Sequence, residues 1–112
     1  MIVHPGVDEC DQALRSLMED RVLVLDGAMG TMVQALRLEE ADVRGDRFAD
    51  HPIDLMNYVD ILCLTQPEAV TGIHDKYCDA GADIITTNTF GASPVGVEEF
   101  QLSPEIVRAV SY

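Results

Sequence analysis

The sequence predicts an α/β fold built on parallel strands, and two short segments carry this prediction. Residues 22–25 form a continuous apolar run that stops at Asp26, and residues 84–85 form a second one that leads into the polar residues 86–89. Continuous rather than alternating apolarity is typical of strands buried on both faces, as in parallel sheets covered by helices. Both strands deliver small polar groups at their C-terminal ends, where parallel α/β proteins place their chemistry.

Helical patterns precede and follow the first strand. Apolar side chains recur at helical spacing over residues 8–20, which predicts a packing helix with Asp8 as its N-cap. After the glycine turn, a short helix is expected over residues 30–37, because apolar side chains again recur every three to four positions.

The second strand is preceded by a longer helix. Thr65 and Glu68 are spaced as a capping box, so the helix is expected to begin there and to end near residue 80, with Gly81 as a left-handed C-cap. Its expected buried stripe consists of Val70, Ile73, Tyr77 and Cys78. Strand, helix and parallel strand then form a right-handed βαβ unit.

Two further segments, residues 38–64 and the residues from Ser93 onward, differ in their sequence patterns. Residues 38–64 are rich in charge and lack a sustained period, so they are expected to form a long loop, either a solvated surface or a functional segment. Ser93 and Ser103 each precede a proline, as helix N-caps do. The last helical pattern stops at Tyr112 after barely two turns, so we expect the chain to be truncated.

Composition excludes several classes of function. Seven Lys and Arg residues stand against 20 Asp and Glu, for a formal net charge of -13. Nucleic acid and anionic membranes need positive charge on the protein, so neither is an expected partner. Residues 1–6 lack the basic and apolar regions of a secretory signal, and no apolar run is long enough to span a membrane. The expected location is the cytoplasm.

The cysteines do not suggest a cross-link or a metal site. Cys10, Cys63 and Cys78 are odd in number and widely spaced, which argues against a disulfide framework and against zinc. Reduced and mostly buried thiols are the expected state.

The first strand ends in residues suited to an α-amino acid. The Asp26 carboxylate can take an ammonium group, and the exposed N–H groups of Gly27 and Ala28 can take a carboxylate. Alternatively, the Asp26 and Gly27 pair is only a turn.

Polar residues after the second strand extend this candidate site. Thr87, Asn88 and Thr89 would lie beside Asp26 if the two strands are neighbours in one sheet. The alternative is that they cap the following turn through local backbone hydrogen bonds.

Five segments in the same order resemble one family. They are LDGAMGTM (residues 25–32), RGDRF (44–48), LTQPE (64–68), AGADII (80–85) and TNTFG (87–91). The sequence resembles the homocysteine-binding methyltransferase family over residues 21–100. Within that family it is similar to the N-terminal region of the cobalamin-dependent methionine synthases, which the RGDRF segment favours over the betaine-dependent branch.

The resemblance implies a fold and a reaction. The fold is a (β/α)8 TIM barrel, of which this chain would contain the N-terminal portion: about two βα units and a preceding helix. Zinc holds the homocysteine thiolate in such enzymes, and the thiolate takes the methyl group of methylcobalamin to give methionine. Asp26, Gly27, Ala28, Thr87, Asn88 and Thr89 would then bind homocysteine.

The same resemblance implies what this chain would lack. The zinc thiolates of the family come from later strands, so no metal ligand and no catalytic residue are expected here, and no zinc or cobalamin would bind this chain alone. Residues 1–20 would be a helical extension and residues 21–112 a partial homocysteine-binding domain. 5-Methyltetrahydrofolate would act through absent domains, and the fragment alone would be inactive.

Two alternatives remain open at this stage. One is a non-catalytic amino-acid-binding or interaction module. The other is a homocysteine methyltransferase that uses betaine or S-methylmethionine as its methyl donor.

Overall fold

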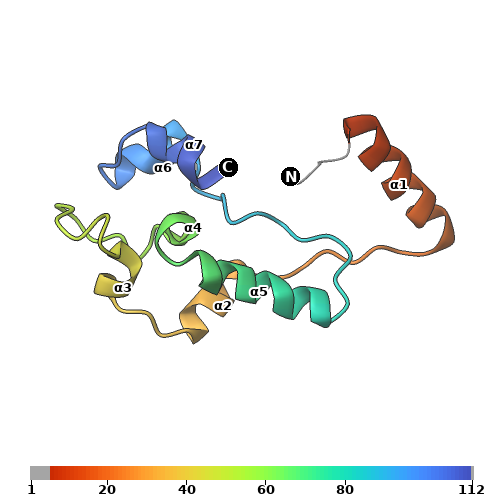
Figure 1. Cartoon of the computed structure of the whole chain (residues 1–112), viewed down its shortest axis with the longest axis horizontal. Helices are drawn as coiled ribbons and strands as arrows, with labels where there is room; N and C mark the ends of the chain where they lie inside the picture. Colours follow the sequence, from red (N-terminus) through yellow and green to blue (C-terminus); the bar gives the residue numbers. More distant parts are fainter. Residues whose placement is uncertain (1–5, 112) are drawn as a thin grey trace.

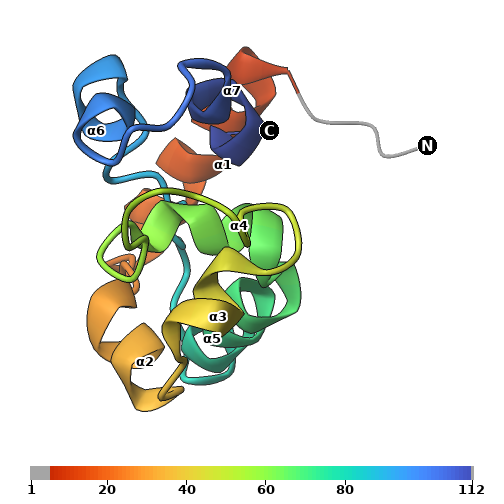
Figure 2. The same cartoon turned by 90° about the vertical axis from the view of Figure 1, so that its left-hand side faces the viewer.

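The computed structural model describes residues 6–111 as a set of helices joined by extended segments (Figures 1 and 2). Outside this range lie residues 1–5 and Tyr112. The prediction that the N-terminus lacks a secretory signal and the end of the last helical pattern fall partly on these residues. The elements are α1 (Val7–Asp20), α2 (Met29–Ala35), α3 (Glu40–Arg44), the 3-10 helix η1 (Val59–Ile61), α4 (Leu62–Thr65), α5 (Pro67–Asp79), α6 (Pro94–Glu99) and α7 (Glu105–Ser111).

The overall shape is elongated. The molecule measures 51 × 28 × 28 Å and has a radius of gyration of 16.3 Å, against about 13 Å for a compact domain of roughly 100 residues. Figure 1 shows the cause: α1 stands apart from the other helices, at the end of an extended connection. No side chain of α1 is buried within residues 7–20, so the expectation of a packing helix is wrong.

The two apolar segments lie side by side and run in the same direction. Leu25 and Ile84 form a parallel bridge. The N–H of Asp26 donates to the Ile84 carbonyl (2.9 Å), and the N–H of Ile84 donates to the Val24 carbonyl (3.2 Å). The pairing is an isolated bridge, and residues 6–111 contain no longer strand. The predicted direction and adjacency are observed, while the barrel stays a prediction.

The apolar side chains of the first segment are exposed. Val22 and Val24 are 85% and 54% exposed, although continuous apolarity predicted burial on both faces. That prediction assumed covering layers of helix and sheet on either side. Within residues 6–111 the buried side chains gather elsewhere, so these layers are not in place.

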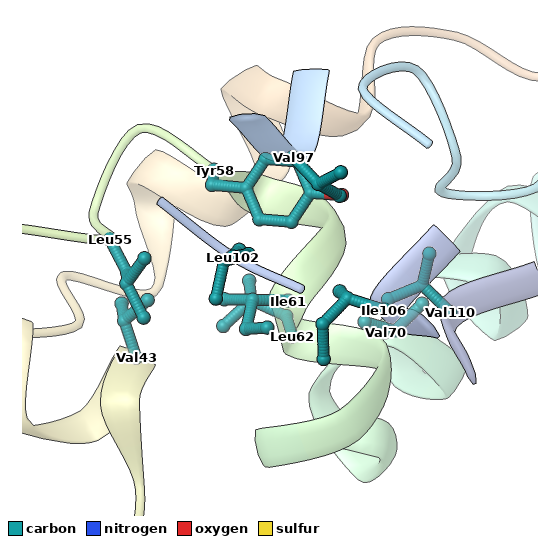
Figure 3. Close-up of a cluster of buried hydrophobic side chains, with 10 residues drawn as sticks. All are labelled: Val43, Leu55, Tyr58, Ile61, Leu62, Val70, Val97, Leu102, Ile106 and Val110. Atoms are coloured by element: carbon teal, nitrogen blue, oxygen red, sulfur yellow. The ribbon is translucent and has the colours of Figure 1, made fainter. Parts of the chain in front are cut away.

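The hydrophobic core lies among the short helices α3, η1, α4, α6 and α7 and one end of α5 (Figure 3). Leu55 and Ile61 are completely buried. The buried members are Val43, Leu55, Tyr58, Ile61, Leu62, Val70, Val97, Leu102, Ile106 and Val110. Much of the core therefore comes from the stretch predicted to be a long loop.

Residues 40–55 are tied together by one arginine and one glutamate. Arg44 donates to Glu40 (Nε to Oε1, 2.8 Å) and to the carbonyls of His51 (2.5 Å) and Ile53 (3.1 Å). Glu40 Oε1 also accepts from the N–H of Leu55 (2.6 Å). These contacts hold the segment over the core, so the expectation of an aperiodic loop is wrong where α3, η1 and α4 form.

Two of the predicted helix starts are wrong. The N-cap of α1 is Gly6, whose N–H donates to Glu9 (3.1 Å), instead of Asp8. The capping box of Thr65 and Glu68 does not form either, because Gln66 is the N-cap of α5 and the Thr65 hydroxyl donates backward to the Ile61 carbonyl (3.3 Å). The Thr65 hydroxyl bonds a carbonyl of the preceding turn and therefore does not cap α5.

Other helix ends agree with the sequence. Ser93 Oγ accepts from the N–H of Gly96 (3.0 Å) and caps α6. At the end of α5, Gly81 has a φ of 106°. Its N–H donates to the Cys78 carbonyl (3.0 Å), and that of Ala82 donates to the Tyr77 carbonyl (3.0 Å). This pair of bonds is a Schellman motif, which requires a left-handed residue such as glycine.

The core predicts a clear contrast between two leucines. Leu55→Ala removes a side chain with 0% exposure, and we expect it to cost about 2–5 kcal/mol of unfolding free energy. Leu17→Ala, at a 47% exposed position of α1, should change the free energy by no more than about 0.5 kcal/mol. Urea unfolding measures both, and equal losses would contradict the placement of the core.

Candidate functional site

The Asp26 carboxylate lies directly after the parallel bridge and is held by the second segment. The N–H of Thr86 donates to Asp26 Oδ2 (2.9 Å), and the Thr86 hydroxyl donates to Oδ1 (3.0 Å). Each oxygen therefore has one donor among residues 6–111. A carboxylate offers about four acceptor positions, so Asp26 retains acceptor capacity for a ligand.

Gly27 and Ala28 form the exposed turn between the bridge and α2. Their N–H groups donate to no atom of residues 6–111. The Ala28 carbonyl, in contrast, accepts from the Tyr77 hydroxyl (2.8 Å). The turn thus presents two free donors beside a carboxylate, which suits a ligand that carries both a negative and a positive group.

The residues after the second segment separate into two groups. The hydroxyls of Thr87 and Thr89 lie 2.7 Å apart and bond each other. Asn88 is 6% exposed, and its amide donates to the Val59 carbonyl (3.0 Å). The Asn88 side chain is thus turned toward η1. The residue that bonds the Asp26 carboxylate is Thr86, which is not among the predicted site residues.

The signal for Thr86 was present in the sequence. It is the first polar residue after the apolar pair of residues 84–85, so it marks the end of the second segment. To predict its contact with Asp26, one must know the register of the pairing. Because Leu25 lies opposite Ile84, Thr86 lies next to Asp26.

A second carboxylate secures the other side of the bridge. Asp83 forms a two-point ion pair with Arg21 (2.8 and 2.6 Å) and accepts from the N–H of Val24 (2.9 Å). The Arg21 hydrogen bond, followed by that of Val24, lowers the pKa of Asp83 to about 2. The pair joins the two segments at the end opposite Asp26.

A cavity of about 590 Å³ adjoins the turn. Met29 and Gly30 of α2 line it next to the turn, and Asp60, Asn88 and Gly91 line it near η1. Asp60 is buried, which raises the pKa of its carboxyl, although it accepts from the N–H of Gly91 (2.8 Å). Of the predicted site residues, Asn88 is the one that reaches this cavity.

The described residues do not provide a metal site. No cluster of three His, Cys, Asp or Glu side chains within residues 6–111 is placed to hold an ion. Cys10 and Cys78 are exposed and Cys63 is half-buried, all as free thiols, so the expectation of mostly buried cysteines is wrong. A zinc ion does not fit any of them in this arrangement. No helix of this part of the chain is long and apolar enough to cross a membrane.

The match to a known family covers both segments of the site. A model of the family described as Homocysteine S-methyltransferase matches residues 23–111. The chain belongs to this family. The match begins just before Asp26 and includes Tyr77, Thr86 and the polar residues after it, and it confirms the resemblance found in the sequence.

The ion pair of Arg21 and Asp83 predicts a pH-dependent stability. Because the pKa of Asp83 in the folded chain, about 2, lies below its ordinary value of 3.8, the stabilisation is complete above that ordinary value and is lost as the pH falls toward 2. Asp83→Asn should therefore lower the melting temperature by a few degrees at pH 7 and by much less at pH 2.

A matched variant controls for the loss of a carboxylate. Asp11→Asn breaks the ion pair with Arg15 (2.8 Å), which is exposed and within one helix, and should have little effect at either pH. If Asp83→Asn lowered the melting temperature equally at pH 7 and pH 2, the ion pair would not be the cause.

Proposed function

We propose that this chain is the homocysteine-binding part of a methionine synthase-type homocysteine S-methyltransferase. Asp26 would take the ammonium of homocysteine, and the N–H groups of Gly27 and Ala28 would take its carboxylate. The observation that carries the proposal is the combination of a carboxylate with spare acceptor capacity and two free donors on one exposed turn. Membership of the family supports homocysteine as the ligand.

The remaining predicted residues would surround the ligand. Thr87 and Thr89 lie close to Thr86 in sequence and present their hydroxyls as a bonded pair. Asn88 would act indirectly, because its amide bonds the Val59 carbonyl and so anchors the segment against η1. Thr86 would hold Asp26 in place for the ligand.

The methyl donor and the fold are part of the same proposal. The RGDRF segment supports a donor of the methylcobalamin and 5-methyltetrahydrofolate type, and its Arg44 orders the long segment after α3. A (β/α)8 barrel is supported by the parallel pairing of the two segments. Zinc would activate the thiol in the complete enzyme, but the described residues hold no ligands for it, and we assign it no step here.

Titration of the purified chain with L-homocysteine tests the binding proposal. Asp26→Asn removes the charge but retains the size of the side chain, and we expect it to weaken binding about 10- to 100-fold, as loss of a charge-assisted hydrogen bond does. 4-Mercaptobutyrate, which lacks the ammonium, should bind weakly to the parent chain and equally weakly to the variant. Asp11→Asn, a change of the same kind on exposed α1, serves as the control for loss of one carboxylate.

Two results of this titration, and one result of a methyl-transfer assay, would count against the proposal. Absence of homocysteine binding to the parent chain would refute it. An equal loss of both ligands in Asp26→Asn would show that Asp26 does not meet the ammonium. Binding that is confirmed without any methyl transfer in the protein encoded by the whole gene would instead indicate a non-catalytic amino-acid-binding module.

The donor is tested separately. Methionine formation is measured with methylcobalamin, betaine and S-methylmethionine as alternative donors, using the protein encoded by the whole gene. Product with methylcobalamin is expected, and product with betaine or S-methylmethionine alone would contradict the methionine synthase type. Reading the gene beyond codon 112 adds a second test. The family resemblance implies that a later pair of adjacent cysteines supplies zinc thiolates, so such a pair is expected downstream.

A further inference from the structure

Tyr77 contacts the turn of Gly27 and Ala28 in two independent ways. Its hydroxyl donates to the Ala28 carbonyl (2.8 Å). Its ring also lies on Gly27: a Cβ added there would be 3.1 Å from both Cε1 and Oη of Tyr77. Real Cβ atoms rarely come so close to a neighbour, so the glycine lets the ring reach the backbone.

Tyr77 is itself fixed at the end of α5. Ile73 and Val70, about one and two turns earlier, are buried, so α5 is anchored on the protein interior. The Tyr77 carbonyl accepts from the N–H of Ala82 (3.0 Å) in the Schellman motif. The next residue is Asp83, whose N–H donates to the Val24 carbonyl (2.8 Å). One residue thus links α5, the second segment and the turn.

These contacts fix the backbone on both sides of a free donor. The hydrogen bond to the Ala28 carbonyl orients the peptide unit between residues 28 and 29, and the ring contact limits the path of the chain at Gly27. The N–H of Ala28 lies between these two points. Its direction is therefore constrained by Tyr77.

We infer that Tyr77 is the positioning residue of the substrate carboxylate site, since it holds the N–H groups of Gly27 and Ala28 toward that carboxylate. The inference rests on the proposed function. It assigns separate supports to the two charged ends of an amino-acid ligand: Thr86 supports Asp26 at the ammonium end, and Tyr77 supports the turn at the carboxylate end.

Ligand analogues separate this role from a general loss of stability. 4-Mercaptobutyrate retains the carboxylate and lacks the ammonium, whereas 3-mercaptopropylamine retains the ammonium and lacks the carboxylate. Tyr77→Phe retains the ring and removes the hydroxyl. We expect this variant to bind L-homocysteine and 4-mercaptobutyrate about three- to tenfold more weakly, as loss of one neutral hydrogen bond does. Its affinity for 3-mercaptopropylamine should be unchanged. Calorimetry measures all three affinities.

A matched tyrosine and a second variant complete the design. The Tyr58 hydroxyl also donates to a backbone carbonyl, that of Gly91 (3.3 Å), so Tyr58→Phe reproduces the loss of such a bond away from the turn and should affect none of the ligands. Gly27→Ala places a Cβ 3.1 Å from the Tyr77 ring, so that the ring must shift slightly, and it should give the same ligand pattern as Tyr77→Phe.

The possible results are distinct. If the parent chain binds homocysteine and Tyr77→Phe weakens all three ligands equally or none of them, the positioning role is refuted and the proposed function stands. If the parent chain does not bind homocysteine, the proposed function fails and the carboxylate role fails with it. Weakening confined to the two carboxylate ligands supports both.

Discussion

The parallel pairing of Leu25 with Ile84 sets the position of every group around the candidate site. A slip of one residue would turn each side chain to the other face and would separate Asp26 from Thr86. Two carboxylates hold the register, one on each side of the bridge. Asp83 accepts from the Val24 N–H before it, and Asp26 accepts from the Thr86 N–H after it. With so short a pairing, these side-chain bonds replace the ladder that a longer sheet would supply.

The sequence was sufficient for the direction and adjacency of the two segments, because both follow from continuous apolar runs joined by a helix. The sequence was not sufficient to predict the contact between Asp26 and Thr86. Hydrophobic pattern locates the end of a strand but says little about which residue lies opposite which. The same limit explains Asn88, whose amide is taken by the Val59 carbonyl through a contact between distant parts of the chain.

The errors in the fold have two physical causes. Arg44 and Glu40 organise residues 40–55 through bonds to backbone groups, and such bonds leave no trace in the hydrophobic pattern. The burial predicted for Val22 and Val24 fails for another reason. An apolar run shows that a segment can be buried. The layers that bury it must come from other residues, and the core of the described residues lies elsewhere.

The distance along the chain between the two halves of the site affects the order in which the molecule is assembled. Arg21 and Asp83 are separated by 62 positions, and Asp26 and Thr86 by 60. Contacts between near neighbours form faster than contacts that close a long loop. During synthesis, residues 26–28 leave the ribosome early but acquire their geometry only after residue 86 has emerged. The geometry of the first part of the candidate site to be made is therefore completed only when the second part has been made.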